Sequence, residues 1–406
     1  MHIIDGGVTA ALGFRSGGIA CGIKKRKQDL ALVVSDRPCS FAGAFTTNLV
    51  QAAPVHWDKQ VVASSKQVQA LVINSGNANA CTAKQGEDDA QAMAEYTAKQ
   101  FGLDAQEVLV CSTGVIGVPL PMDKVFSGIE LCAAELKDDR QGALEAAQAI
   151  MTTDTFSKEV AVSVEIEGKT VHIGGMAKGS GMIHPNMATM LSFITTDAVI
   201  EKDVLQTLLG SSIIDTYNMI SVDGDTSTND TVLVMANGAS GTGSLSPDHP
   251  QWEDFTSAFL HVHTELAKAI VRDGEGAGKF LEVTVRGAKD KQTAQVLARS
   301  IITSNLVKTA FFGSDANWGR ILCAMGYSKA TFNPEKIDLF FSSAKGTIQV
   351  VKDGVPLQFD EHQAKAILLE KEVKTLALLS EGEGEGTAWG CDLSYEYVRI
   401  NGDYRS

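Results

Sequence analysis

Short apolar runs, each bounded by Gly, Ser, Pro or charged residues, predict β-strands along much of the chain. The expected strands lie at Ile19–Ile23, Asp29–Val34, Phe41–Phe45, Val68–Ile73, Val108–Cys111 and Phe280–Val285. Two hairpins are expected, one at Val160–Glu167 with Thr170–Ile173 and one at Ile337–Phe341 with Thr347–Val351. Apolar residues alternate from Trp389 to Tyr397, which predicts a last strand with one buried face.

Other stretches carry apolar residues at helical spacing. The clearest is Trp252–Val271, where the stripe consists of Phe255, Phe259, Val262, Leu266 and Ile270. Further helices are expected at Glu87–Phe101, Ser127–Leu136, Gln141–Met151, Lys202–Leu209, Lys291–Val307 and Asn317–Met325. Because strands and helices mix without regular βαβ alternation, we expect an α+β fold, a layered sheet-and-helix sandwich. The 406 residues suffice for two domains or one large two-layer unit.

Composition narrows the range of partners. The formal net charge of −14 argues against nucleic acid and anionic membranes, because phosphate binding needs a basic face. No apolar run approaches the ~18 residues of a membrane span, and the N-terminus lacks the pattern of a secretory signal. The 7 cysteines are scattered without CxxC spacing, which favours reduced thiols in a cytoplasmic protein.

Several motifs resemble ligand-binding loops but fail on spacing or context. GGMAKGS (174–180) has Lys-Gly-Ser where a phosphate loop has Gly-Lys-Ser, and GEGAG (274–278) follows a predicted helix rather than a strand. DGDTSTND (223–230) begins like a calcium loop, but Thr228 and Val234 stand where Gly and Glu are needed. A buried, hydroxyl-rich turn is expected there instead. The histidines form no cluster, so we expect no metal and no cofactor.

The stretch KGSGMIHPNMATML (178–191) carries the most distinctive chemistry. The small residue Ala188 precedes Thr189, whose hydroxyl needs a nearby base to act as a nucleophile. A cut before Thr189 would create an α-amine that serves as this base, with an unperturbed pKa of about 7.7–8.0. The same hydroxyl can make the cut by attacking the Ala188 carbonyl. The oxyanion then needs fixed donors, for which the Thr113–Gly114 step is a candidate.

This stretch resembles the cleavage-site signature of the ArgJ family, the glutamate N-acetyltransferase/ornithine acetyltransferase enzymes of arginine biosynthesis. Further stretches resemble blocks of that family, in the family's order: NSGNANACT, CSTGVIG, IMTTDT, GGMAKGSGM, SVDGDTSTNDT, VRDGEGAGKF, VKTAFFGSDANWGRI, AWGCDLSYEYVRIN and INGDYRS. The likeness covers nearly the whole chain. It implies an N-terminal-nucleophile-like fold with two interleaved lobes. It also implies autocatalytic cleavage at Ala188–Thr189 into an α chain (1–188) and a β chain (189–406), which assemble as an α2β2 heterotetramer.

The resemblance also implies roles for individual residues. Thr189 would be the nucleophile, acetylated on Oγ, and Thr113 with Gly114 would form the oxyanion hole. The implied substrate contacts are Thr152, Lys178, Thr189, Glu275, Asn401 and Ser406. The chain departs from the family pattern in having Gly278 where Ser or Thr is frequent, and in ending on Ser406 where many members end on Thr. Ser406 keeps a hydroxyl and Gly278 leaves Glu275 in place, so both departures are mild.

The implied reaction is a ping-pong acetyl transfer. N-acetylornithine gives its acetyl group to Thr189, ornithine leaves, and glutamate takes the acetyl group to become N-acetylglutamate. Both substrates carry an α-carboxylate, which Lys178 is expected to hold, while Glu275 is expected to face the ornithine amine. The C-terminal INGDYRS (400–406) is expected to close the site against water. Acetyl-CoA is a further co-substrate in some family members, and no motif here reports on it.

Two alternatives stay open at this point. A self-processed N-terminal-nucleophile amidase or aminopeptidase would use the same nucleophile but release its acyl group to water. A non-catalytic binding protein of amino-acid metabolism would leave Ala188–Thr189 as a plain turn. NSGNANACT (74–82) is equally ambiguous, because it fits either a simple turn or a cluster of backbone and amide donors.

Overall fold

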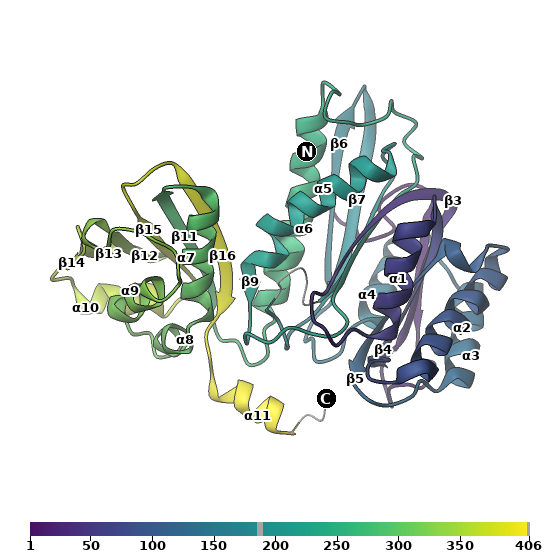
Figure 1. The fold of residues 1–406 in the computed structure, drawn as a ribbon, viewed down its shortest axis with the longest axis horizontal. Coiled ribbons are helices and arrows are strands. Elements are labelled where there is room, and N and C mark those ends of the chain that lie inside the picture. The colour runs from purple at the N-terminus through teal and green to yellow at the C-terminus, as the bar shows by residue number, and fades with distance from the viewer. Residues whose placement is uncertain (185–189, 404–406) are drawn as a thin grey trace.

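The computed structural model describes residues 1–184 and 190–403, whose strands form two sheets (Figure 1). The larger sheet has the spatial order β1 (His2–Ile4), β6 (Lys158–Ile166), β7 (Lys169–Lys178), β8 (Leu191–Thr196), β10 (Thr231–Ala236), β3 (Leu30–Phe45), β4 (Val68–Asn77) and β5 (Val108–Val115), with β2 (Phe14–Ile19) also paired to β3. The smaller sheet has the order β14 (Val355–Pro356), β13 (Gly346–Lys352), β12 (Asp338–Ser343), β15 (Glu372–Leu378), β11 (Phe280–Ala288), β16 (Gly384–Cys391) and β9 (Ile220–Ser221).

The long strand β3 belongs to both halves of the larger sheet. Its first part pairs with β2 and β4, its last part pairs with β10, and the register shifts between Val34 and Cys39. Side chains alternate across a strand, so Leu30 and Leu32 enter one apolar cluster and Ala31 and Val33 enter another. The second cluster also contains residues of β4 and β5 from one half and of β7, β8 and β10 from the other. The larger sheet is therefore folded into two layers that face each other across this core.

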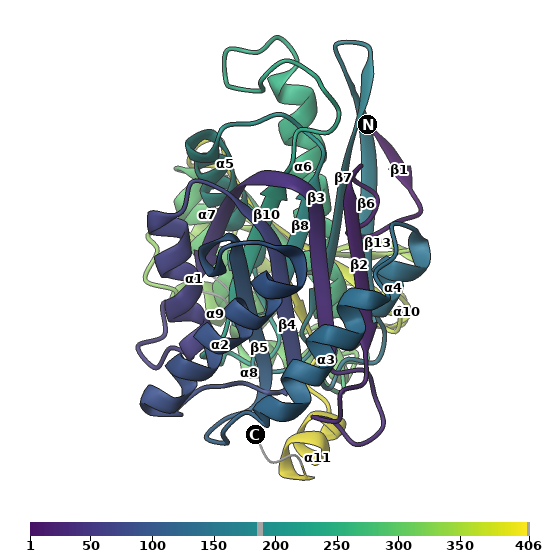
Figure 2. The same ribbon diagram turned by 90° about the vertical axis from the view of Figure 1, so that its right-hand side faces the viewer.

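Helices cover the outer faces of the two layers. α2 (Ala83–Phe101) and α3 (Met122–Ala134) pack on the layer of β2, β4 and β5, while α5 (Lys202–Asp215) and α6 (Trp252–Arg272) pack on the other. α1 (Ala53–Ser64) and α4 (Arg140–Ala149) contribute to the core between the layers. The order helix, sheet, sheet, helix, seen edge-on in Figure 1, confirms the predicted layered α+β sandwich. Figure 2 shows α2 and α3 lying in front of the strands that they cover.

The two lobes are interleaved along the chain. α7 (Lys291–Thr303), α8 (Asn305–Phe312), α9 (Trp318–Gly326) and α10 (Glu361–Leu368) surround the smaller sheet. Strand β9 lies between elements of the larger lobe in sequence, yet it pairs with β16 of the smaller sheet. After β16 the chain leaves the smaller lobe and forms α11 (Tyr395–Asp403) (Figure 1). One apolar cluster joins the lobes, because it contains both Leu266 of α6 and Val283 of β11.

Four predictions differ from the structure. The strand expected at Ile19–Ile23 is mostly loop, because β2 ends at Ile19. The helix expected over 291–307 is broken at Ser304, whose side chain accepts a hydrogen bond from the Val307 amide and starts α8. The last strand ends at Cys391, and Tyr395 lies in α11 with 83% of its surface exposed. The strands expected at Asp29–Val34 and Phe41–Phe45 are parts of the single strand β3.

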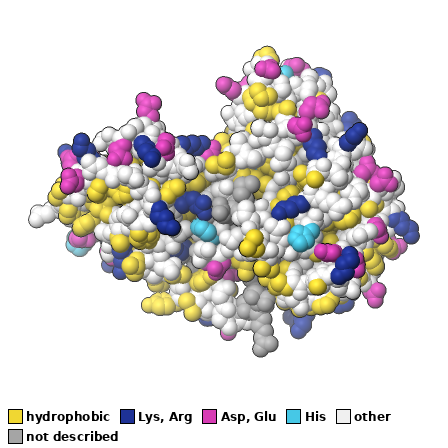
Figure 3. Space-filling view, in the orientation of Figure 1, with side chains coloured by type: hydrophobic (Ala, Val, Ile, Leu, Met, Phe, Trp, Pro, Cys, Tyr) yellow, Lys and Arg dark blue, Asp and Glu magenta, His cyan; other side chains and the backbone are white. Residues whose placement is uncertain are grey.

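On the face drawn in Figure 3, acidic and basic side chains are intermixed over both lobes. Within residues 1–184 and 190–403, no helix combines the length and the apolar character needed to cross a membrane.

Candidate active site

A pocket of about 170 Å³ lies where the ends of several strands of the larger sheet meet. Strand β7 ends there at Lys178, β8 begins there at Leu191, and β5 reaches it from the other layer. Every predicted site residue within the described ranges lines this pocket: Thr113, Gly114, Thr152, Lys178, Glu275 and Asn401. Ala188, Thr189 and Ser406 lie outside the described residues. Met190, which follows Thr189 in sequence, lines the pocket as well.

The Thr113–Gly114 step is shaped by a bulge between the parallel strands β4 and β5. The register shifts at Asn77, which pairs with both Thr113 and Val115. Gly114 has φ of 134°, and a Cβ at this position would lie 2.3 Å from the carbonyl carbon of Gly76. Only glycine fits here, because the neighbouring group is backbone and has no side-chain freedom to move away. The close approach of the two strands therefore fixes how this step faces the pocket.

Neutral amide and hydroxyl groups hold the loops around this step. Asn229 donates through Nδ2 to the carbonyl oxygens of Ala78 at 2.6 Å and Ser112 at 2.8 Å. Ser112 donates from Oγ to Oδ1 of Asn74 at 2.6 Å, and Nδ2 of Asn74 donates to the Asn77 carbonyl oxygen. The asparagines of NSGNANACT thus serve largely to satisfy buried backbone, which orders the loop that carries the pocket wall.

The segment DGDTSTND contributes more than the expected turn. Its hydroxyl-rich end is buried, as predicted, but Thr228, Asn229 and Asp230 also line the pocket. At its start, the Asp223 carboxylate accepts hydrogen bonds from the amides of Met182 and Ile183. The segment therefore ties the chain just before residue 185 to the pocket wall. No role at the site was expected for Thr228, Asn229 or Asp230 from the sequence.

Lys178 brings a buried cation to the pocket. Lys178 is the last residue of β7 and is only 8% exposed. Burial lowers the pKa of Lys178, while the nearby Asp154 carboxylate acts in the opposite direction. Burial alone would raise the pKa of Asp154, but Lys178, Lys158 and the Gly179 amide hold it below its usual range. Asp154 is therefore an anion, and it favours the protonated form of Lys178.

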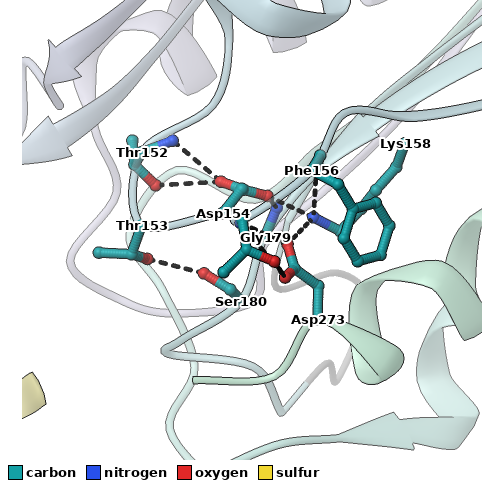
Figure 4. A network of polar contacts seen from close by, with 9 residues as sticks. Thr152, Thr153, Asp154, Phe156, Lys158, Gly179, Ser180 and Asp273 are labelled. Carbon is teal, nitrogen blue, oxygen red and sulfur yellow. Dashed lines mark hydrogen bonds and ion pairs between the residues drawn. The ribbon is translucent and has the colours of Figure 1, made fainter. Parts of the chain in front are cut away.

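Asp154 also organises the loop that carries Thr152. Its Oδ2 accepts a hydrogen bond from the Thr152 amide at 2.9 Å, and its Oδ1 accepts one from the Gly179 amide at 2.7 Å (Figure 4). Next to it, the hydroxyls of Thr153 and Ser180 are 2.7 Å apart. The loop after α4 and the turn after β7 are thus joined side by side.

Glu275 lies at the opposite side of this turn. Its amide donates to the Ser180 carbonyl oxygen at 2.8 Å, and its carboxylate receives a hydrogen bond from Nδ2 of Asn401 at 2.8 Å. A Cβ at Gly181 would lie 2.4 Å from the Glu275 carboxylate, so the absence of a side chain there makes room for it. The hydrogen bond from Asn401 to Glu275 brings α11 back to the larger lobe, where Asn401 lines the pocket.

His184 is the histidine of the central stretch that the structure describes. Its Nδ1 lies 3.2 Å from the Ser221 hydroxyl and its Nε2 lies 3.2 Å from Arg299. Burial, followed by the charge of Arg299, lowers the pKa of His184. The ring is therefore held between two neighbours.

The fold is a helix–sheet–sheet–helix sandwich of the N-terminal-nucleophile-like class, and hydroxyl, amide, ammonium and carboxylate groups line a pocket at the ends of its inner strands. The ArgJ family model matches residues 15–406, and the chain belongs to the ArgJ family.

Relatives and a solved structure agree with this assignment. The "Arginine biosynthesis bifunctional protein ArgJ" of Caldanaerobacter subterraneus subsp. tengcongensis is 51% identical over 406 residues, covering 100% of both chains. ArgJ 1 of Clostridium acetobutylicum is 52% identical over 395 residues, which are 97% of this chain and 96% of that protein. A crystal structure of the protein of the same name from Bacillus halodurans is 50% identical with a TM-score of 0.51, and the match covers 53% of this chain and 100% of that one.

Proposed function

We propose that this chain is an acyltransferase of arginine biosynthesis that moves the acetyl group of N2-acetylornithine to glutamate through an acetyl-Thr189 intermediate. The observation that carries the proposal is the gathering of Thr113, Gly114, Lys178 and Glu275 in one pocket beside Met190. Such a pocket offers donors for an oxyanion, a cation for a carboxylate and an anion for an amine. The relatives named for arginine biosynthesis support the substrate class.

The first step is cleavage of the Ala188–Thr189 bond. The hydroxyl oxygen of Thr189 attacks the Ala188 carbonyl carbon, the nitrogen leaves, and water then hydrolyses the resulting ester. This gives an α chain of residues 1–188 and a β chain of residues 189–406. The latter holds slightly more than half of the 406 residues, and the solved chain from Bacillus halodurans, matched over 100% of its length, covers 53% of this chain. The agreement in length supports the division.

Acetyl transfer then uses the new amine of Thr189 as the base. The amine takes the hydroxyl proton while Oγ bonds to the acetyl carbon, and the amide bond breaks as ornithine nitrogen receives that proton. The negative oxygen formed on the way accepts hydrogen bonds from the Thr113 hydroxyl and the Gly114 amide. In the second half, the glutamate amine attacks the ester and Thr189 recovers its proton.

Charged groups of the pocket select the substrates. Lys178 pairs with the α-carboxylate that acetylornithine and glutamate share, and Thr152 contacts the same end of the substrate. Glu275 faces the ornithine ammonium at the far end. Asn401, together with Ser406, closes the pocket against water, which would otherwise hydrolyse the acetyl ester. The hydrogen bond between Asn401 and Glu275 supports this closure, because it anchors α11 at the pocket.

Two measurements test the proposal. Denaturing mass spectrometry should show two chains in place of one of 43.1 kDa, and Thr189→Ala should remain intact and inactive. Incubation with N-acetylornithine should give N-acetylglutamate when glutamate is present and little acetate without it. An amidase of the same architecture would instead release acetate at one rate with or without glutamate, and this result would replace the proposal. Glutamate acetylation from acetyl-CoA is measured in parallel to decide whether the enzyme is bifunctional.

A further inference from the structure

Behind the pocket lies a buried cluster of three charges: Asp154, Lys158 and Asp273 (Figure 4). The Lys158 ammonium is 2.6 Å from Oδ1 of Asp154 and 2.5 Å from Oδ2 of Asp273. The Lys158 and Asp154 side chains are 0% exposed and the Asp273 side chain is 2% exposed. Lys158 and Asp273 do not line the pocket, and no role was expected for any of the three.

A buried cluster of three charges is expected to add little net stability to a fold. Moving an ammonium and two carboxylates out of water costs several kcal/mol per ion, and well-packed apolar side chains often serve stability equally well. A buried ion cluster is better explained where the exact position of its partners matters. The contacts of Asp154 and Asp273 with their neighbours indicate which positions these are.

Each carboxylate holds a segment that carries a proposed substrate contact. Asp154 accepts hydrogen bonds from the Thr152 amide and from Gly179, the residue directly after Lys178. Asp273 accepts hydrogen bonds from the Thr155 amide and hydroxyl, and Glu275 follows two positions later. The Lys158 ammonium joins the two carboxylates. Three segments far apart in sequence are thereby fixed to one point.

Charge balance connects the cluster to the pocket. Two carboxylates and one ammonium leave one negative charge, and the Lys178 ammonium is the nearby cation that offsets it through its interaction with Asp154. Several charged groups influence the pKa of Lys178. They are Asp154 after α4, Lys158 on β6, Asp230 before β10, Glu275 after α6 and Lys24 before β3. Among them, Asp154 gives the largest attraction that favours protonated Lys178.

We propose that the Asp154–Lys158–Asp273 cluster is the positioning element of the substrate site. Asp154 sets Lys178 and Thr152 for the α-carboxylate, and Asp273 sets Glu275 for the distal ammonium, with Lys158 holding the two arms at a fixed separation. The inference rests on the proposed acetyl transfer, and it adds residues that act through the substrate-binding side chains without touching substrate.

Loss of the Asp154 charge and loss of the Asp273 charge should change the kinetics differently. In Asp154→Asn, KM should rise about 10-fold for both N-acetylornithine and glutamate, because the shared carboxylate site is disturbed. The alkaline limb of kcat/KM should also move about 1 unit toward lower pH, since Lys178 loses the anion that favours its charged form. In Asp273→Asn, KM for N-acetylornithine should rise several-fold more than KM for glutamate, and the alkaline limb should stay in place.

Asp197→Asn is the matched control. Asp197 is 0% exposed and accepts hydrogen bonds from the amides of Leu12 and His172, but it lies beyond the end of β8 that is remote from Lys178. It should lower the unfolding temperature while leaving KM values and the alkaline limb unchanged. All variants are compared as fully cleaved protein, checked by mass spectrometry. If Asp154→Asn and Asp273→Asn match this control in every kinetic parameter, the inference is overturned.

Poor folding of Asp154→Asn would leave the decision to Asp273→Asn, whose ratio of the two KM values must change for the inference to stand. Should the wild type transfer no acetyl group, the proposed function fails, and calorimetric binding of ornithine decides the inference separately. Weaker ornithine binding in Asp154→Asn than in Asp197→Asn then supports it. Equal binding in these variants, or no binding to the wild type, overturns it.

Discussion

The two sides of the pocket are built from different chemistry. One side, called here the amide wall, consists of Thr113, Gly114 and Asn229, whose partners are neutral hydroxyl, amide and backbone groups. The other side, called the charged wall, consists of Lys178 and Glu275, backed by Asp154. Neutral donors fixed by backbone contacts suit a charge that exists only during the reaction. Charged groups suit substrates that arrive with charges of their own.

This difference leads to a general expectation. Changes in the amide wall should mainly lower kcat, because its proposed oxyanion donors would act on the transition state. Changes in the charged wall should mainly raise KM, because its ions bind the ground state as well. Each of the following variants tests one side of this division.

The largest effect is expected for Gly114→Ala in the amide wall. The new Cβ would lie 2.3 Å from a backbone carbon of Gly76, so the step between β4 and β5 must shift and move the donors. Loss of one oxyanion donor lowers kcat by roughly 10²–10³. Steady-state kinetics should therefore show a kcat defect with nearly constant KM. Gly117→Ala is the control, because Gly117 also has positive φ, at 79°, but a Cβ there meets nothing within 4 Å. Equal losses in both variants would show that backbone strain alone is responsible.

Lys178→Met comes next, in the charged wall. Removing the cation should raise KM for N-acetylornithine and glutamate by about 10–100-fold, the loss of one charge-assisted hydrogen bond of ~1.5–3 kcal/mol. Because burial lowers the pKa of Lys178, substrate binding in the wild type should weaken as pH rises through that pKa. The variant should lack this alkaline decline in pH profiles of kcat/KM. A variant that lost kcat at constant KM would place Lys178 with the amide wall.

Glu275→Gln should have a smaller and more selective effect. The amide keeps the size of the side chain but loses the charge that is proposed to face the ornithine ammonium. We expect KM for N-acetylornithine to rise about 10-fold, with little change for glutamate. Kinetics with each substrate varied separately will measure the ratio. A parallel rise for both would contradict the assigned role of Glu275.

Asn401→Ala should have the smallest effect of the four. It removes one exposed hydrogen bond to Glu275, worth about 0.5–1.5 kcal/mol. The expected result is a rise in KM of a few-fold and more acetate released per turnover, because α11 is held less firmly. Acetate and N-acetylglutamate should be quantified together. If the variant releases acetate and N-acetylglutamate in the same ratio as the wild type, α11 has no role in closing the pocket.

Much of the fold was accessible from the sequence because local patterns reported it directly. The apolar stripe of Trp252–Val271 became α6, and most of the continuous apolar runs became strands. The error at the last strand arose where a tertiary contact decides the local structure. Cys391 ends β16, and the following Asp392 turns its carboxylate to the amides of Gly278 and Lys279, a contact that residue spacing does not encode.

Only part of the site could be predicted from the sequence. Lys178, Thr113 and Glu275 came from family blocks, and the pocket brings them together. Asn229 and Lys158 were missed although their blocks or neighbours were noticed, because their partners lie far away in sequence. Asn229 contacts backbone at residues 78 and 112, and Lys158 contacts Asp273. Long-range pairing of polar groups leaves no periodic trace in a sequence.

The spatial order β7–β8–β10–β3 has a consequence for a chain divided at residue 189. Strands β8 and β10 come from the second part and are inserted between β7 and β3 of the first part. Scission of the backbone at that point would therefore remove no hydrogen bond between the described strands, and the larger sheet would still join the two products. Neither piece contains the whole larger sheet. The larger sheet should therefore form only when both pieces fold together, and mixing separately made halves should fail where cleavage within the folded precursor succeeds.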